Sequence, residues 1–387
     1  MNMPKDKRIT MALILLSFLP FQGISGQEAR KVDPGGKTFS LKSKILNEER
    51  VVSIALPASY HESAQAYPVL ITLDGEDFFP AFSGMVSYYS SIGKCPELIV
   101  IGIEAVDRWR DYTPTRADIP DGTPIPNSGG ADAFLGFIDR ELMGYVREHY
   151  RVTPFHVLCG HSIGGLFVVN TLFDASADFS AFIATSPSLW WDGELMKKKA
   201  VRAAAPKDSH ASFLFMTMGN EGASMLDPAL EFTRALEADS GENLIWAFRR
   251  FKDADHQTMP VKAFAYGLDF IFSDWRMPPE ISAEGLDAVL AYYAGLSQKY
   301  RQVLEVPENV LNRMGYMAMN KGKLEDALEI FKLNVNKHPG SANAYDSLGE
   351  AFLKAGDIEN AVRNYRKSLD LNPENENARS ILNKLGR

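Results

Sequence analysis

The chain has 387 residues, with 41 Lys and Arg against 49 Asp and Glu, a formal charge of -8 and 45% hydrophobic residues. This length exceeds one ordinary domain, and the composition is that of a globular protein rather than a disordered or fibrous one. The acidic balance argues against nucleic acid as a partner, because phosphate binding needs concentrated basic surface. The two cysteines, Cys95 and Cys159, are too few for a disulfide framework or a four-thiolate zinc site, and we expect free thiols.

Residues 1–26 have the pattern of a secretory signal peptide. The basic residues Lys5, Lys7 and Arg8 precede an apolar run at 11–19, and Gly and Ser follow up to residue 26. A membrane anchor needs roughly 18–20 apolar residues, and Pro20 interrupts this shorter run. The sequence therefore predicts export to the periplasm or the outside of the cell, with cleavage and no membrane span in the mature chain. The cleavage region holds no cysteine for a lipid anchor.

Residues 27–280 are predicted to form an α/β domain with a mostly parallel central sheet. Two β-rich runs, 39–46 and 50–56, favour an antiparallel hairpin through Asn47-Glu48-Glu49. Later runs at 69–73 and 98–103 are continuously apolar, as expected when helices cover both faces of a sheet. Further strands are expected at 155–159, 181–185, 213–218 and 244–251, and an apolar stripe predicts a helix at 133–150.

Residues 281–387 are predicted to form a small all-α domain with an internal repeat. At a separation of 34 residues, Gly315 matches Gly349 and Gly322 matches Gly356, a period that resembles the tetratricopeptide repeat. Two units, at about 307–340 and 341–374, are fewer than a stable stack needs, so we expect flanking helices at 283–300 and 374–385 to complete the array or dock it on the first domain. Two roles stay open, a stabilising cap or dimer contact and a peptide-binding groove.

The sharpest motif is Gly-His-Ser-Ile-Gly-Gly at residues 160–165. It follows a strand-like run and precedes a helical one, which is the context of a nucleophile elbow. The chemistry needs glycines there, because the serine occupies a strained turn in which larger neighbours would collide with strand and helix. Ser162 is therefore the candidate nucleophile.

A serine attacks only when a base takes its proton, so a histidine is required. In the α/β-hydrolase order the acid follows the serine, and the histidine comes after the last strand. His256, in the loop just beyond the strand expected at 244–251, fits this order and is the candidate base. The other histidines precede or adjoin the serine, precede the acid-bearing strand or lie in the repeats: His61, His149, His156, His161, His210 and His338.

The acid is expected just past the strand at 213–218. Glu221 lies nearest the strand end, where triad acids are presented, and Asp227 is the alternative. Asp253 and Asp255 are closer to His256 in sequence but out of order. We expect Glu221 to orient the imidazole and stabilise the imidazolium without taking the proton.

An oxyanion hole needs two backbone N–H groups aimed at developing negative charge. One is expected from Ile163, directly after the nucleophile. The other is expected from Glu76, in the turn that follows the strand at 69–73.

Five motifs together resemble the esterase family of α/β-hydrolases, and within it the enterochelin (catecholate siderophore) esterase-like branch. They lie at 67–75, 107–114, 128–134, 160–165 and 186–191, the last reading Ser-Pro-Ser-Leu-Trp-Trp. The resemblance covers about residues 38–278 and implies carboxyl-ester hydrolysis by Ser162 with His256 as base. The acid varies in such enzymes and some use a dyad, so a Ser162–His256 dyad is the alternative to a triad with Glu221. The helical repeats lie outside the resemblance.

The substrate is expected to contact a long loop at 104–132, rich in Pro, Gly and Asp. Arg108, Arg110 and Tyr112 from this loop, with Trp190 and Trp191 opposite, would suit a catechol or another aromatic acyl group. The other reading is that these residues pack the loop on the domain. A ferric tris-catecholate is strongly anionic and suits an acidic chain only if the loop arginines dominate locally. Feruloyl or acetyl esters on polysaccharide are therefore the alternative substrates.

The chain is thus predicted to be a serine esterase that needs no cofactor and no metal. Its expected partners are a small-molecule or glycan ester and, through the repeats, another protein or a second copy. A catalytically inactive hydrolase-fold protein that binds a partner through its repeats is the competing hypothesis. The presence of Ser162, His256 and an acid in the expected order favours the enzyme.

Overall fold

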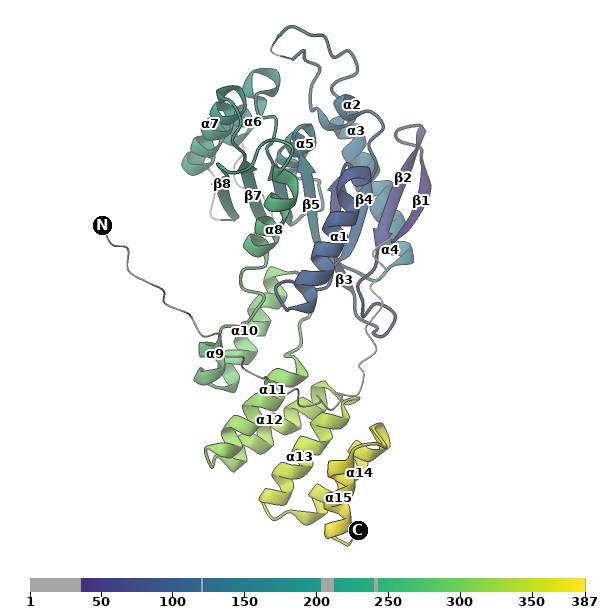
Figure 1. The fold of residues 1–387 in the computed structure, drawn as a ribbon, viewed down its shortest axis with the longest axis vertical. Coiled ribbons are helices and arrows are strands. Elements are labelled where there is room, and N and C mark those ends of the chain that lie inside the picture. The colour runs from purple at the N-terminus through teal and green to yellow at the C-terminus, as the bar shows by residue number, and fades with distance from the viewer. Residues whose placement is uncertain (1–35, 120, 203–211, 240–242, 387) are drawn as a thin grey trace, which may run out of the picture. The chain divides into compact units, whose positions relative to one another are not determined.

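The computed structural model describes residues 36–119, 121–202, 212–239 and 243–386 (Figure 1). The predicted signal peptide, residues 1–26, lies outside these described residues. Within the described ranges, no helix is both long and apolar enough to cross a bilayer.

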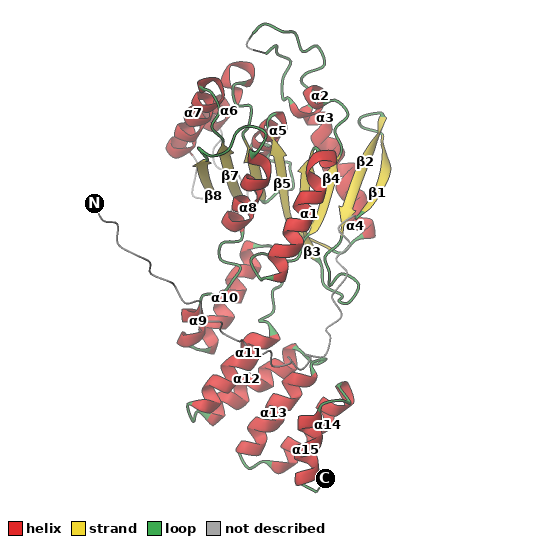
Figure 2. Ribbon diagram, in the orientation of Figure 1, coloured by secondary structure: helices red, strands yellow, loops and turns green. Residues whose placement is uncertain are grey.

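A central eight-stranded sheet organises the first domain, with strand order β1-β2-β4-β3-β5-β6-β7-β8 (Figures 1 and 2). β2 pairs antiparallel with β1 and with β4, whereas the strands from β4 to β8 are parallel. The mostly parallel α/β architecture predicted from the sequence is confirmed. The strands are β1 (Lys37–Ser43), β2 (Glu48–Ala55), β3 (Tyr67–Leu73), β4 (Ile99–Ile103), β5 (Val152–His161), β6 (Ala181–Thr185), β7 (Ser212–Met218) and β8 (Leu244–Arg250).

The inner strands β3, β4, β6 and β7 are buried throughout because helices cover both faces of the sheet (Figure 2). Every residue of β3 is buried, and successive side chains point to opposite faces. Val69, Ile71 and Leu73 join the core on one face, whereas Leu70 joins the core on the other. The helices of this domain are α1 (Gly75–Ser91), α2 (Arg108–Tyr112), α3 (Ala131–Gly136), α4 (Met143–His149), α5 (Ile163–Leu172), α6 (Trp191–Arg202), α7 (Ala223–Asp239) and α8 (Met259–Ile271).

Two local predictions are corrected. The hairpin turn expected at Asn47-Glu48-Glu49 lies earlier, because Glu48 and Glu49 already belong to β2, and Asn47 adopts a left-handed φ of 55°. The single helix expected at 133–150 is α3 and α4 joined by a π-helical turn, η1 (Phe137–Leu142). The wider turn still buries the predicted apolar stripe, including Phe134 and Val146.

Both cysteines are free, as predicted, and both are buried in the same hydrophobic cluster. β3 lies between β4, which Cys95 precedes, and β5, which contains Cys159. Burial raises the pKa of the Cys95 thiol to about 12, so this side chain is a small hydrophobe rather than a nucleophile.

The C-terminal region is helical and shows why the repeat carries glycine. A Cβ at Gly315 would meet the Phe331 ring at 2.5 Å, and one at Gly349 would meet the Tyr365 ring at 3.2 Å, so the paired helices pack too closely for a larger residue. Its helices are α9 (Pro279–Glu284), α10 (Leu286–Lys299), α11 (Glu308–Asn320), α12 (Leu324–Lys337), α13 (Ala342–Lys354), α14 (Ile358–Leu371) and α15 (Glu376–Lys384).

The end of α10 is part of the core of the first domain. Tyr300 is fully buried, and its ring lies 5.2 Å from that of Phe155 in β5 and 5.3 Å from that of Phe272. Its hydroxyl donates to Ile271 O (3.0 Å) and to Asp274 Oδ1 (2.5 Å), and Lys299 Nζ pairs with Asp274 Oδ2 (2.7 Å). This flanking helix therefore docks on the α/β domain, one of the two arrangements that the sequence left open.

Candidate active site

Ser162 lies at the sharp turn between β5 and α5, with φ 61° and ψ -117°. Few residues with a side chain adopt a positive φ, and such strain is concentrated at functional sites. The flanking glycines permit the turn: a Cβ at Gly160 would meet Gly164 O at 2.5 Å, and one at Gly165 would meet Thr185 O at 3.0 Å. The local geometry is that of a nucleophile elbow.

A chain of hydrogen bonds joins Ser162, His256 and Glu221. His256 Nε2 lies 3.0 Å from Ser162 Oγ, and His256 Nδ1 lies 2.7 Å from Glu221 Oε2. His256 comes from the loop between β8 and α8, and Glu221 from the loop between β7 and α7. The structure thus brings together three residues that are up to 94 positions apart in the sequence.

The environment of Glu221 keeps its carboxylate charged. Burial of this side chain favours the neutral acid, but hydrogen bonds from His256, from Ser186 Oγ and from Gly219 N–H outweigh it and lower the pKa of Glu221. An ionised carboxylate beside Nδ1 can orient the imidazole and stabilise its protonated form.

The other acids considered from the sequence lie elsewhere. Asp227 is an exposed residue of α7. Asp253 pairs with Lys262 Nζ at 2.5 Å, and Asp255 accepts the Thr258 N–H at 2.9 Å. Of the four candidates, Glu221 is the one that the structure places against His256.

The two expected oxyanion donors begin two helices that follow neighbouring parallel strands. Ile163 is the first residue of α5, after β5, and Glu76 is the second residue of α1, after β3. First-turn N–H groups have no acceptor within their own helix and sit at the positive end of its dipole. The Glu76 carboxylate accepts the Ala105 N–H at 3.1 Å, which ties this turn to the chain after β4.

Arg108 lies beside the elbow and is held by Asp74. Its Nε and Nη2 donate to the two Asp74 oxygens at 2.8 and 3.0 Å, and Nη2 also approaches His161 O at 3.5 Å. The Arg108 side chain is 40% exposed, so it can contact a ligand. Burial raises the pKa of Asp74, although the hydrogen bonds from Arg108 and Tyr112 oppose the shift.

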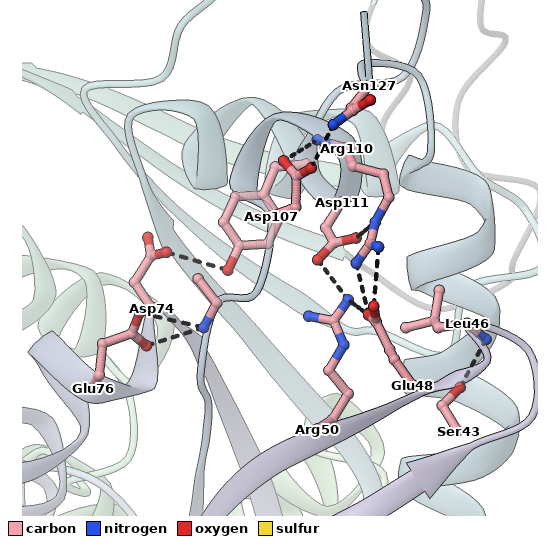
Figure 3. Close-up of polar contacts among 12 residues, drawn as sticks. Ser43, Leu46, Glu48, Arg50, Asp74, Glu76, Asp107, Arg110, Asp111 and Asn127 are labelled. Carbon is pink, nitrogen blue, oxygen red and sulfur yellow. Dashed lines mark hydrogen bonds and ion pairs between the residues drawn. The ribbon is translucent and has the colours of Figure 1, made fainter.

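Arg110 pairs with two carboxylates, those of Glu48 and Asp111 (Figure 3). Its Nη1 and Nη2 donate to Glu48 at 3.0 and 2.6 Å, and its Nε donates to Asp111 at 2.8 Å. Arg50, fully buried, pairs with the same two carboxylates. The Arg110 side chain is still 32% exposed, so its expected contact with substrate stays a prediction.

Two predicted substrate contacts, Tyr112 and Trp191, are corrected by burial. Tyr112 is 1% exposed and donates to Asp74 Oδ1 at 3.2 Å, and Trp191 is fully buried and donates to Thr115 Oγ1 at 3.1 Å. Both side chains pack the loop on the domain, as the alternative reading held. Trp190 is half-buried, with its Nε1 3.1 Å from Met225 Sδ, and keeps an accessible surface.

Sequence reasoning missed His161 as a contact of the candidate base, His256. Its ring lies 4.5 Å from that of His256, and its Nε2 is buried without a partner among the described residues. Burial, with a smaller contribution from His256, lowers the pKa of His161 to about 4. Its position inside the Gly-x-Ser-x-Gly motif was the available signal.

His161 should make stability pH-dependent. The unfolded chain binds a proton on His161 below about pH 6.5, whereas the folded chain binds it only below about pH 4. The unfolded state therefore holds more protons between these values, and the free energy of unfolding falls by about 3 kcal/mol as pH drops from 6.5 to 4. Between pH 6.5 and pH 4, the free energy of unfolding of His161→Phe, measured in urea, should fall by less than that of the wild type. The control is His61→Phe at an exposed position; a pH slope for His161→Phe equal to that of the wild type would contradict the assignment.

A mostly parallel sheet with a serine at a strand-to-helix turn defines the protein as an α/β-hydrolase. Residues 43–259 match the model of the family described as "Putative esterase", and residues 342–375 match a tetratricopeptide repeat. The first match spans more than half of the chain, and the protein belongs to this esterase family.

Several of the curated relatives are siderophore esterases. Ferri-bacillibactin esterase BesA of Bacillus subtilis is 31% identical over 182 residues, 43% of this chain and 63% of that protein. The siderophore enterobactin esterase of Emericella nidulans is 40% identical over 90 residues, 21% of this chain and 29% of that one. The chain thus spans less than two thirds of the length of these relatives. Among solved structures, an IroE-like serine hydrolase from Shewanella oneidensis is 27% identical with a TM-score of 0.67, covering 78% of this chain and 99% of that chain.

Proposed function

We propose that the protein is an exported serine carboxyl-ester hydrolase that acts on catecholate siderophore esters through Ser162, His256 and Glu221. The observation that carries the proposal is the continuous hydrogen-bond chain from Ser162 Oγ through the His256 ring to Glu221, at a strained strand-to-helix turn. Serine, base and orienting acid in this arrangement are the parts that nucleophilic acyl transfer requires.

The reaction follows from these atoms. Ser162 Oγ attacks the ester carbonyl carbon while His256 Nε2 takes its proton, and the N–H groups of Ile163 and Glu76 stabilise the oxyanion. The intermediate collapses, the alcohol leaves with the proton from His256, and an acyl ester remains on Ser162. Water then attacks this ester with His256 as base, and the carboxylic acid leaves as Ser162 regains its proton.

Two observations support a catecholate substrate. The named relatives are a ferri-bacillibactin esterase and an enterobactin esterase. Arg108 also offers a part-exposed guanidinium beside the elbow, and Trp190 offers an aromatic surface in the motif after β6. Cations and aromatic faces suit anionic, aromatic acyl groups.

Export and a partner for the repeats complete the proposal. The basic, apolar and small-residue order of residues 1–26 supports export, which the N-terminus of the mature protein, read by mass spectrometry, would check. The tetratricopeptide repeat is a unit that stacks into binding surfaces. A protein partner or a second copy is the proposed ligand of this domain, and light scattering separates the two.

The direct test is product release from two esters in one chromatographic assay. One is a catecholate trilactone with and without iron, and the other is a feruloyl sugar ester, with Ser162→Ala as the blank. Cleavage of the trilactone by the mature protein is expected. Cleavage of the feruloyl ester alone would keep the triad and reject the siderophore substrate, and equal product from the blank would reject the serine mechanism.

A further inference from the structure

The turn after β6 holds a strained, buried serine that the mechanism above does not use. Ser186 follows the last residue of β6 and begins the Ser-Pro-Ser-Leu-Trp-Trp motif. It is fully buried and adopts φ 42°, in the left-handed region that disfavours side chains other than glycine's. Such a conformation persists only where surrounding contacts determine it. The contacts of Ser186 therefore hold it in this strained conformation and indicate what the residue does.

These contacts lead to the triad acid. The Ser186 N–H donates to Thr217 O in β7 at 2.9 Å, and its Oγ donates to Glu221 Oε1 at 2.5 Å. Because the other oxygen of this carboxylate, Oε2, faces His256 Nδ1, Ser186 and His256 hold opposite sides of the same group. Gly219 N–H adds a main-chain donor to Oε1 at 3.0 Å.

The same turn also supports the nucleophile. The Ser162 N–H donates to Thr185 O at 2.9 Å, and the Ser188 N–H donates to Ser162 O at 3.0 Å. The main chain on either side of Ser186 thus fixes the elbow, while its side chain reaches the acid. One short segment joins both ends of the Ser162–His256–Glu221 chain.

We infer that Ser186 is a positioning residue of the triad, which rests on the proposed function of that site. A glutamate on a loop has a long side chain whose carboxylate can rotate, and one anchored oxygen leaves that rotation free. The Ser186 hydroxyl, together with the Gly219 N–H, anchors the second oxygen, so that Oε2 stays directed at His256 Nδ1. A neutral donor to a charged acceptor is among the stronger hydrogen bonds of proteins.

The test is a double-mutant cycle on ester hydrolysis by the full-length protein. Ser186→Ala should lower kcat about tenfold with little change in KM, because it acts on His256 through Glu221 rather than on substrate. In a Glu221→Ala background the same change should cost nothing further, because the carboxylate that Ser186 positions is gone. An equal loss in both backgrounds, or no loss in the first, would overturn the inference.

Two further variants separate positioning from folding. Ser180→Ala alters another buried serine, just before β6, whose Oγ has no partner among the described residues, and it should keep full activity. Ser186→Gly removes the same hydroxyl and suits φ 42°, so it should repeat the loss even if the alanine variant folds poorly. Full activity in Ser186→Gly would contradict the inference.

The pH dependence of kcat/KM distinguishes a positioning role of Ser186 from a purely structural one, because a purely structural role would leave it unchanged. Ser186 is one of the donors that lower the pKa of Glu221. Ser186→Ala should therefore shift the acid limb of kcat/KM to higher pH, whereas Ser180→Ala should not. A shifted limb supports the inference, and an unshifted one opposes it. If the wild type cleaves no ester, or Ser162→Ala cleaves as well as the wild type, the proposed function itself is rejected. If only the Ser186 variants fail to show the expected changes, the role of Ser186 is rejected and the proposed function stands.

Discussion

Ser162→Ala is expected to lower kcat for ester hydrolysis by on the order of 10⁴- to 10⁶-fold while leaving the fold intact. The change removes the atom that attacks the carbonyl carbon. It disturbs little else, because the main chain of Ser162 is held by Thr185 O and by the Ser188 N–H, which alanine keeps. Initial rates on one ester, with thermal unfolding of each protein, measure both parts of the prediction.

The remaining triad members supply the comparison. His256→Ala should be about as damaging as Ser162→Ala, and the double variant should be no worse than either, because triad residues act as a unit. Glu221→Ala should cost less, since the base and nucleophile remain. Asp227→Ala is the matched control, an exposed carboxylate of α7. A larger loss for Asp227→Ala than for Glu221→Ala would show that the wrong acid has been assigned.

Ending the chain at residue 280 is expected to make it aggregate, whereas ending it at residue 305 should leave a folded esterase domain. The shorter chain lacks α10 and the buried Tyr300, whose ring packs on Phe155 and Phe272 and whose hydroxyl bonds to Asp274. Without them, this part of the core is exposed to water. Ester hydrolysis and urea unfolding of the soluble fractions of both chains give the measurement.

A single substitution in the full chain measures how much Tyr300 contributes to the free energy of unfolding. Replacing a large buried aromatic residue by alanine costs about 3–5 kcal/mol, a large share of the roughly 5–15 kcal/mol that holds a domain folded. Tyr300→Ala should show a loss of this size, and Tyr293→Ala serves as the control from a half-buried position of the same helix. A chain of 280 residues as stable and active as the full protein would show that α10 is only a tether.

The local sequence pattern and the order of motifs along the chain were enough to predict the elbow, the candidate base and the helical repeat. The glycines of the elbow are required by the close main-chain approaches around Gly160 and Gly165, so the motif, between a strand-like and a helical run, points to Ser162. The order serine, acid, histidine then favours His256 and places the acid at Glu221 or Asp227, since in a parallel sheet the loops after successive strands open at one edge. The 34-residue repeat could also be predicted from the sequence, because Gly315 and Gly349 recur where paired helices touch.

Only the tertiary structure decided which of the expected contact residues are buried and which partners their side chains have. Arg110 pairs with Glu48 across 62 positions, and Ser186 meets Glu221 across 35, so no spacing in the sequence reveals either contact. Aromatic and cationic loop residues have the same composition whether they line a pocket or pack a loop, and the burial of Trp191 separates the two cases. Backbone patterns are set by neighbours in the chain and can be read there, whereas side-chain partners are set by where the folded sheet brings distant loops.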